Sequence, residues 1–186
     1  MDKYLDIRVL SNPEVSSPIL MNALFGKLHR RLMELRSETI GVSFPKHDNT
    51  LTTLGSTLRL HGNFESLEQL MADNWLKGIG DHVNFREIHA VPNVRSYRVV
   101  RRVQVKSSPE RLRRRYEKRH KVSGDQALAV IPDGVAKRLN LPFVTLQSRS
   151  TGQRFPLFIN HETKDSPNPG KFGYYGLSQD ATVPWF

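Results

Sequence analysis

The chain has 186 residues, no cysteine and a formal net charge of +10. The lack of cysteine excludes disulfides, thiolate metal sites and a cysteine nucleophile. The sequence contains no run of about 18 apolar residues, so it predicts no transmembrane helix. We therefore expect a soluble, cytoplasmic protein with no membrane partner. The charge is concentrated, because residues 95–121 hold 12 basic and two acidic residues and the rest of the chain is neutral. Such a basic segment indicates a polyanionic partner, and nucleic acid is the commonest one.

The first half of the chain predicts alternating strands and helices. Residues that alternate between apolar and polar indicate strands, and leucines repeated every three or four residues after Ser17 and Pro18 indicate a helix. The predicted elements are a strand over 4–10, a helix over 18–36, strands over 39–44 and 57–61, a helix over 64–77 and a strand over 82–88. This order is the ferredoxin-like arrangement, which RNA-recognition motifs share. The strand over 57–61 lacks the aromatic residues with which those motifs bind RNA, so the sheet face is predicted to be a poor RNA platform.

The second half begins after Pro92 and Asn93, which predict a boundary between a domain over 1–93 and a domain over 94–186. We expect a smaller α+β domain there, with an arginine-rich helix that opens at a Ser-Ser-Pro-Glu sequence. The overall fold class is α+β. The predicted elements are a strand over 97–105, a helix from about 107 to 121, two helical pieces over 125–140, a hairpin over 143–150 and 153–160, and a last strand over 172–177.

The arginine-rich helix carries a stripe of five cations. At about 100° per residue, the stripe contains Arg111, Arg114, Arg115, Lys118 and Lys121. Leu112 and Tyr116 form a narrow apolar face elsewhere on the helix, and only two glutamates are available to pair with the cations. A stripe with more cations than nearby glutamates predicts polyanion binding that weakens steeply with salt. Whether the polyanion is DNA or RNA stays open at this point.

Candidate catalytic residues are few. The sequence contains seven histidines but no H-E-x-x-H motif, and no metal or other cofactor is predicted. His29 falls at the edge of the apolar stripe of the first helix, beside basic residues, which suits proton transfer near a phosphate; by position alone, an ordinary boundary histidine is the commoner interpretation. Ser148 and Ser150 fit turn chemistry equally well, and Phe155 fits either core packing or stacking on a base.

Together the segments of this sequence resemble a known family, the CRISPR RNA-processing endoribonucleases of type I-F systems (the Csy branch). The resemblance covers essentially the whole chain. The matching segments are 1–8, 24–29, 40–45, 102–107, 109–115, 141–146, 148–153, 175–178 and 183–186.

The resemblance implies an N-terminal ferredoxin-like domain and a C-terminal domain with an arginine-rich helix. It implies that the protein binds the stem-loop of the repeat in precursor CRISPR RNA and cuts at the 3′ base of the stem without a metal. The 2′-hydroxyl would attack the adjacent phosphate and leave a 2′,3′-cyclic phosphate. The enzyme would then stay on the product as a subunit of the type I-F crRNA-guided surveillance complex.

The resemblance also implies roles for single residues. His29 would be the proton-transfer residue, Ser148 would hold the 2′-hydroxyl, and Tyr175 rather than Tyr174 would orient the site. Arg102 and Gln104 would read bases at the foot of the stem, and Phe155 would stack on its last pair. The other RNA-binding residues implied are Ser107, Arg111, Arg114, Arg115, Lys118, Arg119, Ser150 and Thr151. Lys118 stands where the family often has arginine, so a phosphate contact is expected there.

Two alternative functions remain open at this stage. The first is an RNA-hairpin-binding protein that does not cut, and the second is a DNA-binding regulator that uses the basic helix.

Overall fold

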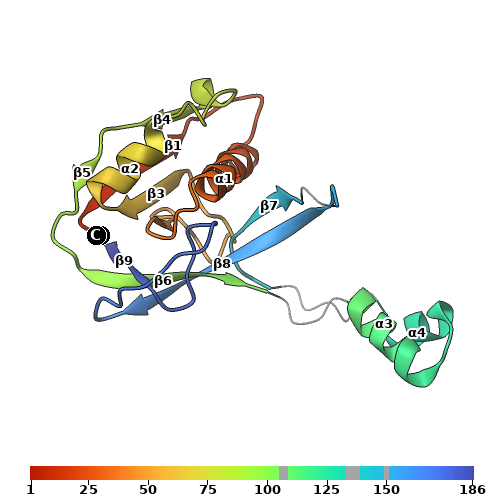
Figure 1. Ribbon diagram of the computed structural model, residues 1–186. Coiled ribbons are helices and arrows are strands. Elements are labelled where there is room, and N and C mark those ends of the chain that lie inside the picture. The colour runs from red at the N-terminus through yellow and green to blue at the C-terminus, as the bar shows by residue number, and fades with distance from the viewer. Residues whose placement is uncertain (105–108, 133–138, 149–150) are drawn as a thin grey trace. The chain divides into compact units, whose positions relative to one another are not determined.

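A computed structural model of the chain describes residues 1–104, 109–132, 139–148 and 151–186. The described residues form a mixed α+β structure with two antiparallel sheets and four α-helices (Figure 1). They fall into two compact units, one made of Met1–Val103 with Leu141–Phe186 and the other of Gln104–Asn140. The domain boundary predicted after residue 93 lies between the last strand of the first sheet and the first strand of the second sheet, both within the first unit. The division into domains over 1–93 and 94–186 stays a prediction.

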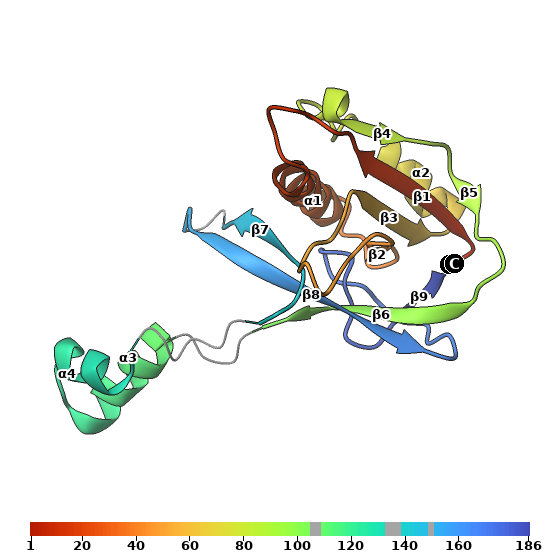
Figure 2. The same cartoon turned by 180° about the vertical axis from the view of Figure 1, so that it is seen from behind.

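The first sheet has the strand order β2-β3-β1-β4, with a short β5 that also pairs with β1. Two helices cover one face of this sheet, as the two opposite views show (Figures 1 and 2). Its elements are β1 (Lys3–Val9), α1 (Ser17–Glu34), β2 (Gly41–Ser43), β3 (Thr57–Gly62), α2 (Phe64–Met71), the 3-10 helix η1 (Gly80–His82), β4 (Val83–Phe85) and β5 (His89–Ala90). The helix α2 ends six residues before its predicted end, because residues 73–77 form short-range turns instead.

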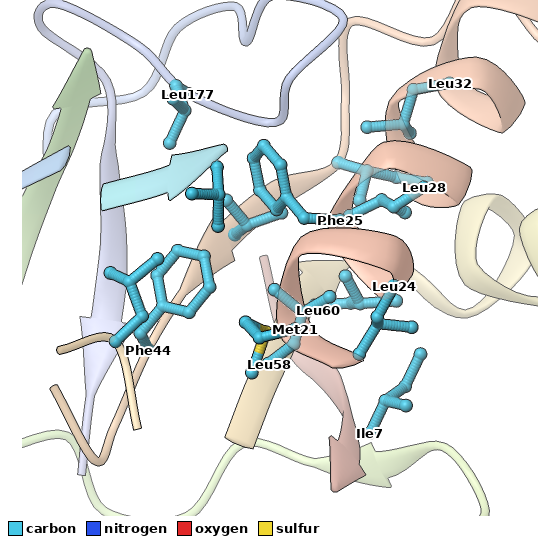
Figure 3. Packing of buried hydrophobic residues seen from close by; sticks show 14 of the residues in the cluster. Ile7, Met21, Leu24, Phe25, Leu28, Leu32, Phe44, Leu58, Leu60 and Leu177 are labelled. Atoms are coloured by element: carbon cyan, nitrogen blue, oxygen red, sulfur yellow. The ribbon is translucent and has the colours of Figure 1, made fainter. Parts of the chain in front are cut away.

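The apolar pattern of the sequence explains why α1 packs where it does. Leu20, Leu24, Leu28 and Leu32 recur every four residues and are all buried, and Pro18 stands in the first turn, where its missing N–H costs nothing. On β1, Leu5 and Ile7 point to the same side and are buried, as alternation requires. These side chains meet Leu58 and Leu60 of β3 in one core (Figure 3).

The second sheet has the strand order β7-β8-β6-β9. Its strands are β6 (Ser96–Val103), β7 (Phe143–Gln147), β8 (Arg154–Lys164) and β9 (Thr182–Trp185). Val100, Val144 and Val183 from three of them belong to the same core as the first sheet. The prediction of a strand over 172–177 is wrong, because the residues around Tyr174 form a turn. The last strand of the chain is β9 instead. That strand contains Pro184, which an edge strand tolerates.

The described residues of the second unit form two helices, α3 (Pro109–His120) and α4 (Gly124–Val130). Ser123 caps α4 in a reciprocal capping box with Gln126, and Ala127 is buried. The side chain of Arg113 donates a hydrogen bond of 3.1 Å to the carbonyl oxygen of Ile131. Residues 133–138, where the second helical piece was predicted, lie outside the described residues. In the described part of the chain, no helix is long and apolar enough to cross a membrane.

Replacing Leu60 by alanine tests the shared core. Leu60 is fully buried on β3, so Leu60→Ala should lower the free energy of unfolding by about 2–5 kcal/mol through lost burial and a cavity. Leu51→Ala is the matched control, because the side chain of Leu51 is 72% exposed and its loss should cost little. Urea denaturation of both variants measures the difference, and equal effects would contradict the position of the core.

Candidate active site

His29 lies on α1, one turn after the buried Phe25, at the edge of the buried stripe. Its ring is partly buried, and its Nδ1 lies 2.8 Å from the carbonyl oxygen of Tyr174. Because a carbonyl can only accept a hydrogen bond, Nδ1 carries the proton and donates it. In the neutral ring, Nε2 therefore keeps a lone pair that can accept a proton.

A tight loop after residue 172 brings Tyr175 against His29. The amide of Gly176 donates to the carbonyl of Gly173 at 2.7 Å, and the amide of Val42 donates to the carbonyl of Gly176 at 2.9 Å. The Tyr175 ring stacks on the His29 ring, with centroids 3.9 Å apart and planes 13° apart. The Tyr174 side chain is exposed, so His29 meets the backbone of one tyrosine and the ring of the next.

Phe25 completes this arrangement on the α1 side. Its ring is parallel to that of Tyr175, with an interplanar angle of 3° and centroids 6.3 Å apart. Phe25 and His29 are four residues apart and so lie on the same side of α1. Tyr175 therefore contacts two consecutive turns of the helix, which fixes the plane of the His29 ring.

The surroundings of His29 lower its pKa below the ordinary value of 6.5. The largest cause is burial, which disfavours the charged ring; the nearby positive charge of Arg30 acts in the same direction, and the hydrogen bond to Tyr174 opposes both. His29 is therefore neutral at pH 7. The folded state also binds fewer protons than the unfolded chain, so this group makes the fold less stable as pH falls below 6.5.

Arg102 on β6 lies next to the same cluster. Its guanidinium carbon is 6.0 Å from the centroid of the Tyr175 ring and 5.8 Å from that of Phe155. Phe155 is partly buried on β8, where it pairs with Leu146 of β7. Four of the residues singled out by sequence, His29, Tyr175, Arg102 and Phe155, thus form one chain of contacts.

Ser148 directly follows β7, in the turn that leads to β8. Its amide donates to the carbonyl of Gln153 and its carbonyl accepts from the amide of Gly152, both at 2.8 Å. The Ser148 hydroxyl accepts a hydrogen bond of 3.3 Å from the amide of Thr151, and the Thr151 hydroxyl in turn accepts from the amide of Gln153 at 3.4 Å. Both hydroxyls therefore take part in the turn, and for Ser148 this agrees with the turn interpretation of the sequence. Ser150 lies outside the described residues.

One contact that the sequence did not suggest connects this turn to α1. The Asn22 side-chain oxygen accepts a hydrogen bond of 2.9 Å from the amide of Thr145 on β7. Gly26, one turn later on α1, lies close to Leu146, whose nearest atom would be in ordinary contact, at 3.7 Å, with a Cβ added at this glycine. Helix α1 therefore carries His29 and also anchors the strand that ends next to Ser148. A polar residue within an apolar helical stretch was the only sequence signal for Asn22.

The cations of the predicted stripe belong to the second unit. On α3 the side chains of Arg111, Arg114, Arg115, Lys118 and Arg119 are exposed, whereas Leu112 and Tyr116 are partly buried. The helix ends at His120 because Lys121 takes a left-handed backbone conformation with φ 53°. Lys121 therefore follows the helix instead of extending its stripe. Gln104 is exposed at the start of this unit, and Ser107 lies outside the described residues.

Metal-ligating side chains do not gather in the described part of the chain. Across residues 1–104, 109–132, 139–148 and 151–186, no group of three histidine, aspartate or glutamate side chains is placed to hold one ion. The candidate site is instead built from an imidazole, aromatic rings, a guanidinium and hydroxyls. Such groups can move a proton, stack on bases and bind phosphate.

Comparison with known proteins gives full-length matches. A family described as CRISPR-associated protein (Cas_Csy4) matches residues 4–186. A protein of Pseudomonas aeruginosa (strain UCBPP-PA14) named CRISPR-associated endonuclease Cas6/Csy4 is 50% identical over 187 residues, covering 100% of both chains. A protein of the same name from Escherichia coli (strain UTI89 / UPEC) is 45% identical over 187 residues, again covering 100% of both chains.

Replacing Gly176 by alanine tests the loop that holds Tyr175. Gly176 has φ +68° and a Cβ there would lie 2.5 Å from Cγ1 of Val42, so Gly176→Ala should displace the loop and lower the free energy of unfolding by about 1–3 kcal/mol or more. Gly78→Ala is the matched control, because Gly78 has φ +84° but no atom within 4 Å of the added Cβ. Thermal unfolding compares them, and an equal loss in both would show that contact with Val42 is unimportant.

Proposed function

The chain belongs to the Cas_Csy4 family of CRISPR-associated proteins and is an endonuclease, and we propose that its substrate is the repeat hairpin of precursor CRISPR RNA. It cuts at the 3′ base of the stem and then remains on the mature RNA as a subunit of the type I-F surveillance complex. The full-length match to two proteins named CRISPR-associated endonucleases supports this substrate. The cytoplasm, where such RNA is made, is the expected location.

In this proposal, residues 1–93 form a ferredoxin-like domain and residues 94–186 form the RNA-binding domain. The strand order β2-β3-β1-β4, with two helices on one face, supports the first assignment. The exposed cations of α3 support the second. The helix would bind the phosphates of the hairpin stem through Arg111, Arg114, Arg115, Lys118 and Arg119. Ser107, Ser150 and Thr151 are assigned to further RNA contacts by the family resemblance.

The observation that carries the catalytic proposal is the fixed and neutral ring of His29. Its Nδ1 donates to the Tyr174 carbonyl, its face is stacked on Tyr175, and burial lowers its pKa. The free Nε2 is thus the atom that accepts the proton of the 2′-hydroxyl. A base held in this way is worth about 10²–10⁴ in rate.

The reaction needs no nucleophile from the protein. The 2′-oxygen forms a bond to the adjacent phosphorus as its proton passes to His29, and the bond from phosphorus to the 5′-oxygen breaks. The products are a 2′,3′-cyclic phosphate and a 5′-hydroxyl, which takes up a proton as it leaves. Ser148 holds the 2′-hydroxyl in line with the bond that breaks, and in-line alignment itself lowers the barrier. No metal takes part in this scheme.

The remaining residues fix which phosphate is cut. Arg102 and Gln104 read the bases at the foot of the stem, and Phe155 stacks on its last pair. The position of the Arg102 guanidinium beside the rings of Phe155 and Tyr175 supports this assignment, since the same residue can then bind a base edge next to the reacting group. Tyr175 keeps the His29 ring in place.

Replacing His29 by alanine should separate cutting from binding. We expect His29→Ala to lower the single-turnover cleavage rate of a type I-F repeat hairpin by about 10²–10⁴ and to leave hairpin affinity within about twofold, because the cations of α3 are untouched. His82→Ala is the control, since His82 belongs to η1 before β4 and should retain full activity. Unchanged cleavage by His29→Ala would disprove its role.

The substrate and the metal requirement are tested in the same assay with the unaltered protein. A hairpin with a 2′-deoxy nucleotide at the cleavage position should bind but stay intact, and the normal hairpin should be cut in excess EDTA. Cutting of the deoxy substrate would refute attack by the 2′-hydroxyl. Binding without any cutting would favour the alternative of a non-catalytic hairpin binder, and preference for duplex DNA over the hairpin at equal salt would favour the DNA-binding alternative.

The pH dependence of cleavage should reflect the lowered pKa of His29. Activity should fall on the acid side as Nε2 becomes protonated, and this limb should lie below pH 6.5 because burial lowers the pKa from that value. In Tyr175→Ala, water reaches the ring, so the pKa should rise and the acid limb should move to higher pH. Normalised single-turnover rates measure the shift, and identical profiles would contradict control of the His29 pKa by the stacked ring.

A further inference from the structure

Figure 2 shows the face of the first sheet that α1 and α2 leave uncovered. The side chains on this face line a hollow of about 140 Å³. It lies on the first unit, away from the residues assigned to catalysis. Its lining is polar and aromatic and consists of Tyr4, Asp6, Arg8, Asn84, Arg86 and His89.

The register of the strands explains why these side chains share one face. Tyr4, Asp6 and Arg8 alternate with buried residues on β1, so they point away from the helices. Asn84 pairs directly with Arg8, and Arg86 follows two residues later on the same side.

An extra residue between β4 and β5 brings His89 to the same face. Phe85 pairs with Ile7, whereas His89 pairs with Tyr4, so four steps on one strand oppose three on the other. This is the pattern of a β-bulge, which redirects side chains. Ile88 consequently packs against the core, and the exposed His89 ring lies 5.9 Å from that of Tyr4.

The charges in this hollow are unbalanced. Arg59 holds Asp6 with two hydrogen bonds of 2.7 and 2.9 Å, so this carboxylate is already neutralised. Arg8 and Arg86 are exposed, and within the part of the chain that the structure describes neither guanidinium group makes a hydrogen bond or an ion pair. Glu87 is exposed nearby, in a neighbouring hollow with Arg86. The two free guanidinium groups leave the hollow positive.

We propose that this hollow binds the backbone phosphate of single-stranded RNA, with the neighbouring base against the His89 ring. Guanidinium groups bind phosphate oxygens with paired hydrogen bonds, and the Asn84 amide can donate a further one. Exposed rings beside such cations are typical of single-strand binding. The prediction that this sheet face is a poor RNA platform rested on the strand over 57–61, which carries no aromatic residue, whereas the rings of the hollow come from Tyr4 on β1 and His89 on β5. The combination favours a nucleotide over a carboxylate, which would need no ring. The choice of RNA rests on the proposed function, because precursor RNA continues as a single strand on either side of its hairpin.

The experiment first fills the main site. The full chain is saturated with the uncleavable 2′-deoxy hairpin, and a fluorescent oligouridylate of about ten nucleotides is then titrated by anisotropy at several salt concentrations. The test variant is Arg8→Gln with Arg86→Gln. The control is Lys46→Gln with Lys77→Gln, which removes the same charge from exposed residues in loops. Circular dichroism and hairpin cleavage verify that each variant is folded and active.

Loss of two phosphate contacts should make the salt dependence of oligouridylate binding shallower by about 1.4 in the log–log slope. Between about 50 and 200 mM salt, wild-type affinity should therefore fall about sevenfold more than that of the test variant. The control variant should keep the wild-type slope, and hairpin cleavage should be unchanged in both.

Equal oligouridylate binding by wild type and test variant, or no binding by wild type, would overturn the proposal. Binding of an oligoglutamate peptide in place of the oligouridylate, with the same dependence on the two arginines, would also overturn it and would assign the hollow to an acidic protein partner. Failure of the hairpin itself to bind or be cut would count against the proposed function instead, so the two failures are distinguishable.

Discussion

The burial of helix α1 on two sides is the constraint on which the rest of the first unit depends. Leu24 and Leu28 are fully buried, and the apolar stripe is wide because Met21 and Phe25 extend it. Residues of both sheets pack in the same core as this stripe. The first sheet covers part of it, Val144 and Leu146 of β7 lie in the same buried cluster, and the hydrogen bond from Thr145 to Asn22 attaches β7 to the helix. The helix therefore joins the two sheets, and the end of its buried stripe is where a polar ring can be held partly exposed.

His29 occupies that end, and its position determines both its geometry and its protonation. Stacking on Tyr175 holds the ring and also removes it from water, so the same contact that orients the imidazole lowers its pKa. The Tyr174 carbonyl limits this effect, because its hydrogen bond from Nδ1 is stronger when the ring is positively charged. The positive charge of Arg30, the next residue on α1, lowers the pKa of the imidazole further.

The sequence predicted well those features that depend on local periodicity. The buried leucines of α1 and the alternation on β1 follow directly from apolar spacing, and His29 fell at the edge of the stripe where the structure has it. The pairing of Tyr175 with His29 did not follow from periodicity; only the family resemblance suggested a role for that tyrosine. Its loop looked like a strand because four of the six residues from 172 to 177 are aromatic or apolar, yet two close hydrogen bonds through Gly173 and Gly176 fold it into a turn. The last strand, β9, was not predicted because it contains Pro184, and proline is unfavourable in a strand except at the edge of a sheet.

Contacts between distant segments were beyond such reasoning, and they decide how the site is assembled. Nothing in the local sequence of Asn22 indicates that its side chain accepts a hydrogen bond from β7, at a separation of 123 residues. Helix α1 is thus contacted by two separate segments, by β7 at Asn22 and by the loop of Tyr174 at His29. A change in the packing of α1 would therefore move Ser148 and Tyr175 together relative to His29. A site built in this way keeps its geometry because its parts share one rigid support, and it needs no contact between the two loops themselves.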